Sequence, residues 1–200
     1  MVKAVWFRNY APNERPDRFD RILQSWDTAN KASELSDFSV CTSWGLKGKD
    51  LYLLHVLRRR MEYPELKRAV VEQAQAFAAQ GRVDRGQGLG NPADPGIGRR
   101  WSAHRNPLPA AGRQDHAMHA QTAMIENGFV HLPKEAGWLA EYVHELTVFP
   151  KGKHDDQVDS TAQMLDWFKR AGQSGRTGCG YSTSEPRLPA YGPRGPNRYR

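Results

Sequence analysis

The chain has 200 residues, a formal net charge of +7 and two cysteines. This length is enough for one domain with a buried core. Cys41 and Cys179 are too few for a disulfide framework or a zinc site, which favours a reducing, cytoplasmic setting. No apolar run reaches the roughly 18 residues of a membrane helix, and the N-terminus lacks the apolar stretch of a signal peptide.

The excess positive charge lies in two segments that are poor candidates for folded structure. Residues 82–115 hold six Arg and three Asp, and residues 171–200 hold five Arg and one Glu. The remaining 18 basic and 18 acidic residues cancel. The net charge therefore gives no support for nucleic-acid binding by the folded part of the chain.

The first 57 residues are predicted to supply a linker segment and three strands. Residues 1–20 mix aromatic side chains with prolines and charges, and we expect them to pack on the domain without being part of it. Apolar runs and apolar–polar alternation predict strands at 21–27, 38–44 and 51–57. The segment 45–50 has the length of a hairpin turn, and it lacks the Lys-Ser or Lys-Thr pair of a phosphate-binding loop.

A helix is predicted at 63–80, with Leu66, Val70 and Phe77 on its apolar face. A strand is expected next, to cover that face. Residues 81–113 instead contain seven Gly and four Pro, and such a long irregular tract is uncommon inside a compact domain. We therefore expect a disrupted central strand and an uncovered helix.

Regular structure is expected to return after this tract. The apolar patterns predict two helices around a short strand, then a last helix and a disordered tail rich in Gly, Ser, Pro and Arg. These segments are residues 116–127, 128–132, 134–146, 155–170 and 171–200.

Acidic residues stand at two places where a metal site could form. Asp27 ends the first predicted strand, and Asp155, Asp156 and Asp159 stand at the start of the last helix. Asp156 and Asp159 project from one helical face. Two-metal cleavage of phosphodiesters uses carboxylates from separate elements, around cations about 3.5–4 Å apart. The alternative is structural, because Asp27 could open a turn and the others could satisfy a helix N-terminus.

Four stretches carry a resemblance to a known family. They are Ser25-Trp26-Asp27-Thr28-Ala29, Leu35-Ser36-Asp37-Phe38-Ser39-Val40-Cys41, Gly128-Phe129-Val130-His131-Leu132-Pro133, and Phe149-Pro150-Lys151-Gly152 through Asp159-Ser160. Over residues 1–81 and 116–169 the chain resembles the C-terminal nuclease domain of the large terminase subunit of tailed phages. The resemblance implies an α/β, ribonuclease H-like mixed sheet flanked by helices.

The same resemblance implies an activity and a site. It implies a Mg²⁺- or Mn²⁺-dependent endonuclease that cuts concatemeric double-stranded phage DNA during head packaging, by in-line attack of a metal-activated water. It places one metal ligand at Asp27 and another in the later cluster, where we rank Asp156 before Asp159 and Asp155. The implied partners are the terminase small subunit and the portal, without a membrane, in a bacterial host. The family's large subunit begins with a packaging ATPase domain that carries a phosphate loop, and because this sequence contains no such loop we expect no ATP site in it.

One catalytic acid of the family has no counterpart here. The family carries it on the strand after the first helix, in a string close to IEDKASGTQLIQEL, where this chain has residues 84–98. If the gene is read one base later, all 14 overlapping residue pairs are compatible with that string. We hypothesise that residues 82–117 are translated out of frame, between two compensating indels or sequencing errors. A genuine insertion is the alternative, and we do not expect Asp84 to replace the acid, because nothing in this tract fixes its backbone.

Two other functions remain open at this point. A catalytically impaired prophage remnant would keep the fold and lack nuclease activity. Another ribonuclease H-like nuclease, such as a junction resolvase or a transposase, is the weaker alternative. The stretches 128–133 and 149–159 argue against it.

Overall fold

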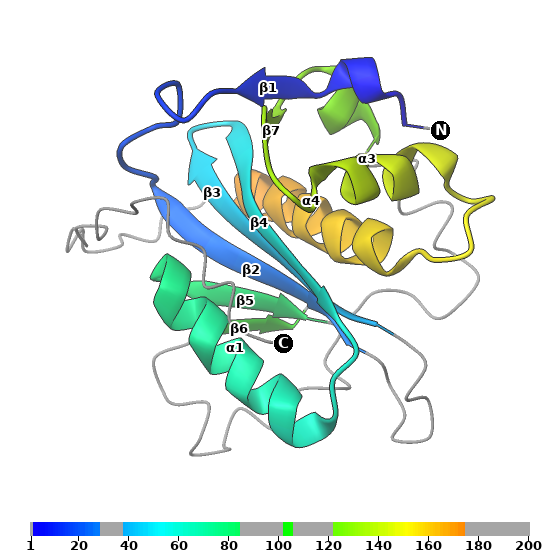
Figure 1. Ribbon diagram of the computed structural model, residues 1–200. Helices are drawn as coiled ribbons and strands as arrows, with labels where there is room; N and C mark the ends of the chain where they lie inside the picture. Colours follow the sequence, from blue (N-terminus) through cyan, green and yellow to red (C-terminus); the bar gives the residue numbers. More distant parts are fainter. Residues whose placement is uncertain (1, 29–37, 85–101, 106–121, 175–200) are drawn as a thin grey trace.

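The computed structural model describes residues 2–28, 38–84, 102–105 and 122–174. They form a seven-stranded mixed sheet with α1 on one face and α3 and α4 on the other (Figure 1). This arrangement confirms the predicted α/β fold of a mixed sheet flanked by helices. In chain order the elements are η1 (Ala4–Trp6), β1 (Arg8–Tyr10), β2 (Arg21–Asp27), β3 (Ser39–Lys47), β4 (Asp50–Arg59), α1 (Tyr63–Phe77), β5 (Gly81–Asp84), β6 (Ser102–Arg105), β7 (Val130–Pro133), α3 (Leu139–Val148) and α4 (Asp156–Ser174).

The strand order is β1-β7-β4-β3-β2-β5-β6. The pairs β2–β3 and β3–β4 are antiparallel, and the other neighbours are parallel. The predicted hairpin is confirmed between β3 and β4, but its turn is shorter than 45–50, because β3 runs to Lys47 and β4 begins at Asp50. Gly48 in this turn has a φ of +58°. Asp20 accepts a hydrogen bond of 2.7 Å from the Gly48 N–H, which ties this turn to the start of β2.

Side chains of β2 alternate between the two faces of the sheet. Leu23 belongs to the larger apolar core, which includes Leu146 of α3 and Leu165 of α4. Trp26 lies in the smaller core, with Leu66 and Val70 of α1. Each of these aliphatic side chains stabilises the fold by roughly 1.5–3 kcal/mol through its burial.

The expectation of an uncovered α1 is wrong. Leu66 and Val70 are buried against Trp26 and Cys41, and the Phe77 ring lies 5.3 Å from the ring of His55. Residues of β2, β3 and β4 therefore cover the apolar face of the helix.

The expectation of a missing strand directly after α1 is also wrong. Residues 81–84 form β5, parallel to β2, and residues 102–105 form β6 beside it. β5 is stable because Val83 is buried in the larger core, while Arg82 and Asp84 neutralise one another on the other face, with Nε 2.7 Å from Oδ2. The tract at 85–101 and 106–121 lies outside the described residues.

Several predicted boundaries shift. Residues 8–10 pair with β7 as an edge strand, so this part of the predicted entry segment 1–20 belongs to the sheet. Residues 122–126 are helical, and the earlier part of that predicted helix lies outside the described residues. α3 begins at Leu139, not at residue 134. α4 extends to Ser174 because its helical hydrogen bonding continues past residue 170, and residues 175–200 lie outside the described part.

Within the described residues, no helix combines the length and the apolar character that crossing a membrane requires.

Candidate active site

Asp27 is the last residue of β2, one of the inner strands of the sheet, and its side chain is partly buried. Because it lies two and four residues from Ser25 and Leu23, its side chain faces the side of the sheet that α4 covers. Its cross-strand partner Val40 is in the core on the same side. The carboxylate thus lies at the end of an inner strand, on the side of α4.

A buried polar contact fixes α4 over β2. The Ser160 hydroxyl donates a hydrogen bond of 3.0 Å to the backbone oxygen of Ser25. The same hydroxyl lies 2.8 Å from the Thr42 hydroxyl of β3. Ser25, Thr42 and Ser160 are all fully buried, so the position of α4 is set close to the end of β2.

The helical phase then decides which side chains of α4 flank Asp27. At about 100° per residue, Asp156, Asp159 and Gln163 fall within an arc of about 60° on one flank of the helix. Gln163 is fully buried, and its Nε2 lies 3.4 Å from Oδ1 of Asp27, a long hydrogen bond. The structure therefore brings the predicted acids Asp27, Asp156 and Asp159 to the same side of the sheet.

The N-terminus of α4 is capped by a carboxylate from α3. Glu145 accepts hydrogen bonds from the backbone N–H groups of Gln157 at 2.7 Å and Val158 at 3.4 Å, and from the Gln157 side chain at 2.6 Å. These N–H groups have no partners inside the helix. Sequence reasoning missed this residue, because a cap supplied by another helix leaves no local signal.

The pKa of the Asp156 carboxyl group is shifted upward. Burial raises its pKa to about 6, and the charge of Glu145 adds to this rise. The Arg58 guanidinium opposes it, with Nη2 at 3.8 Å from the Asp156 carboxylate. Arg58 also pairs with Glu141.

Asp155 directly precedes α4, and its side chain is exposed. Its backbone oxygen accepts the hydrogen bond of the Asp159 N–H at 2.8 Å, which is the first bond of the helix. This is the geometry of an N-cap residue. The structural interpretation therefore suits Asp155 better than Asp156 or Asp159.

Asp84 ends β5, the strand beside β2, yet it faces away from Asp27. It pairs in register with Trp26, whose side chain lies in the core against α1. The expectation that nothing fixes the Asp84 backbone is wrong, because β5 holds it and Arg82 pairs with its carboxylate. The β5 residue on the face of Asp27 is the apolar Val83.

The carboxylates do not form a complete metal site in the part of the chain that the structure describes. Within those residues, no three His, Cys, Asp or Glu side chains gather closely enough to hold a metal ion. Asp27, Asp156 and Asp159 provide oxygen ligands of the type that Mg²⁺ prefers, but β5 adds none on their face.

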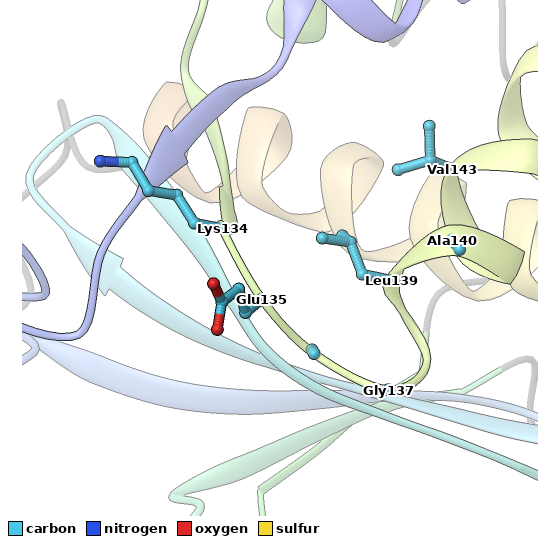
Figure 2. Close-up of a pocket in the computed structure, with 7 residues that line it drawn as sticks. Lys134, Glu135, Gly137, Leu139, Ala140 and Val143 are labelled. Carbon is cyan, nitrogen blue, oxygen red and sulfur yellow. The ribbon is translucent and has the colours of Figure 1, made fainter.

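A separate apolar pocket lies between the loop after β7 and the start of α3. Figure 2 shows Lys134, Glu135 and Gly137 on the loop, and Leu139, Ala140 and Val143 on the helix. None of the candidate acids lines it. We therefore place the candidate active site at the end of β2 and not in this pocket.

Comparison with solved structures shows which fold this is. The large terminase nuclease of thermophilic phage G20c with bound cobalt is 16% identical, with a TM-score of 0.57, and the match covers 81% of this chain and 93% of that one. The nuclease domain of Thermus phage P74-26 gives 13% identity and a TM-score of 0.57, over 80% and 90%. This chain has the fold of a terminase nuclease domain. The resemblance seen in the sequence is confirmed at this level.

The terminase nuclease fold accounts for only part of a whole large terminase. Against the large terminase of another thermophilic bacteriophage, in complex with ADP, the identity is 10% and the TM-score 0.53, and the match covers 76% of this chain and 40% of that one. At the level of sequence, no family model and no curated protein matches the chain.

Proposed function

We propose that this chain is a metal-dependent DNA endonuclease domain of the terminase type. The observation that carries the proposal is Asp27, held at the end of an inner strand on the face where α4 presents Asp156 and Asp159. The shared fold with terminase nucleases supports it. Related structures of the G20c nuclease with cobalt, magnesium and zinc support the use of a divalent cation.

Asp27, Asp156 and Asp159 are the proposed ligands of Mg²⁺ or Mn²⁺, with Asp155 as a weaker candidate. When bound, such cations supply a reactive water and neutralise charge on the phosphate. The chain itself positions its carboxylates through Ser160, Gln163 and Glu145. The proposed substrate is double-stranded DNA.

The proposed biological role is the cutting of concatemeric phage DNA during head packaging, in the cytoplasm of a bacterial host. The terminase small subunit and the portal are the proposed partners.

A catalytically impaired remnant is the second candidate, and one observation favours it. On the face of Asp27, β5 presents Val83 and no carboxylate, and no three acids gather among the described residues. A chain that keeps the fold and lacks one acid would hold its cations weakly.

Nicking of supercoiled plasmid with Mn²⁺ or Mg²⁺ tests both candidates. The nuclease proposal expects the wild-type chain to nick, Asp27→Asn to lose the activity, and Asp17→Asn, an exposed acid in the loop before β2, to keep it. Nicking that survives Asp27→Asn contradicts the proposed site. If the wild type does not nick, the remnant is favoured.

A variant in which the family string is restored tells whether an inactive chain has lost nuclease activity or was never a nuclease. In this variant the family string IEDKASGTQLIQEL replaces residues 84–97. The out-of-frame hypothesis expects it to nick faster than the wild type. Resequencing of the locus separates its two forms, because a sequencing error gives the intact reading frame and a pair of real indels gives a decayed gene. A locus that encodes the present tract, together with an active wild-type chain, contradicts that hypothesis.

A further inference from the structure

Two arginine side chains pack against the ring of Phe38, close to Asp156. Phe38 directly precedes β3, and the guanidinium carbons of Arg58 and Arg60 lie 3.7 and 4.6 Å from its ring centroid. His154 approaches the same ring edge-on, with centroids 5.6 Å apart. His154 Nδ1 in turn lies 4.0 Å from the Asp156 carboxylate. The ring therefore connects the end of β4 with the start of α4.

The two arginines differ in their charge partners. Arg58 is mostly buried and pairs with Glu141 and Asp156, so its charge is balanced within the protein. Arg60 is exposed, and no carboxylate of the described ranges forms an ion pair with it. Stacking on an aromatic ring holds a guanidinium plane in place and leaves its N–H donors open to solvent.

Arg60 also lies on the side of the sheet where the acids are. Arg58 is in register with Val40, and Val40 is in register with Asp27. Cross-strand partners share a face, so Arg58 lies on the side of Asp27. Arg60 follows the end of β4 at Arg59, and its guanidinium shares the ring of Phe38 with that of Arg58. The guanidinium of Arg60 is permanently charged and is held in place on this side of the sheet. Such a group can bind a phosphate through two parallel hydrogen bonds.

We propose that Arg60, held on the ring of Phe38, binds a backbone phosphate of DNA next to the phosphate at Asp27. This assignment rests on the proposed nuclease function, because it takes nucleic acid as the ligand. Phe38 is then a positioning residue, which acts on DNA only through Arg60.

The test measures binding of a short DNA duplex by fluorescence anisotropy, in an Asp27→Asn background with EDTA, so that no cutting interferes. Arg60→Met is expected to weaken binding by roughly three- to tenfold at about 100 mM salt, and to lower the salt-dependence slope by about 0.9. Arg68→Met is the matched control, because it removes the same charge from an exposed position on α1, across the sheet. It is expected to leave affinity and slope unchanged.

Phe38→Leu adds a second readout. It keeps the charge of Arg60 and removes the ring, so it is expected to weaken binding about two- to threefold with an unchanged salt slope. If Arg60→Met binds like Arg68→Met, the phosphate site is overturned. If nicking depends on Asp27 but DNA binding does not depend on Arg60, this inference alone is overturned. If binding depends on Arg60 but the chain does not nick, only the proposed function is overturned.

Discussion

Asp27 and Asp84 end neighbouring strands of the same sheet, and they face opposite ways. Asp27 points to the side of α4, where other acids stand, and Asp84 points to the side of α1, where Arg82 neutralises it. Both are aspartates next to a buried core. Asp84 is in register with Trp26, one residue before Asp27, so the two aspartates face opposite sides of the sheet. Asp27 is therefore available for a site, whereas Asp84 stabilises the fold.

The largest expected effect is a difference in nicking rate between variants of Asp27 and variants of Asp84. Asp27→Asn is expected to lower the nicking rate roughly 100-fold or more, because a metal ligand is lost. Asp84→Asn is expected to leave the rate of the folded protein within about twofold, because its side chain is on the other face. A loss with Asp84→Asn at full folding, checked by circular dichroism, would show that the two faces are coupled.

In stability we expect the opposite order, with Asp84→Asn losing more unfolding free energy than Asp27→Asn. Asp84→Asn leaves the buried Arg82 without its carboxylate and is expected to cost about 3 kcal/mol of unfolding free energy. Asp27→Asn is expected to cost far less, because Asp27 is only partly buried. Urea unfolding of both variants, with exposed Asp17→Asn as control, measures this. Equal losses would contradict the role given to the Arg82–Asp84 pair.

On the α4 side, Asp156 is expected to make stability depend on pH. Its pKa of about 6 lies above the ordinary value of 3.8, so the folded protein keeps a proton that the unfolded chain releases. Stability is therefore lost as the pH rises from about 4 to 6. Asp156→Asn is expected to stabilise by about 2 kcal/mol at pH 7.5 and to change little near pH 3.5. Unfolding at both pH values checks the sign, and a pH-independent difference would contradict it.

The smallest effect concerns the support of Asp27. Gln163→Met keeps the length of the side chain and removes the donor to Asp27, and is expected to weaken Mn²⁺ binding about tenfold. Thr161→Val is the matched control, because Thr161 is equally buried but bonds Tyr142 of α3 on the other flank. Titration calorimetry measures the affinity. Equal binding by both variants would remove Gln163 from the site.

The elements around Asp27 could be predicted from sequence, and those around Asp84 could not. β2 matches its predicted bounds because an apolar run ends at the acid. β5 was missed because only Val83 of its four residues is a strong strand former, and the Arg82–Asp84 pair that permits burial of two charges is visible only in space. The role of Ser160 leaves no local sequence signal, because its hydrogen-bond partners are 118 and 135 residues away.

The buried hydroxyl of Ser160 also bears on how the chain reaches a single native arrangement. Apolar side chains tolerate small rotations of a helix, because one hydrocarbon contact replaces another. If α4 docked one residue out of phase, about 100° around its axis, the hydroxyls of Thr42 and Ser160 would be buried without partners, at about 1–3 kcal/mol each. This penalty selects against misdocked intermediates during folding. Ser160→Ala should therefore leave a folded domain in which α4 samples more than one orientation.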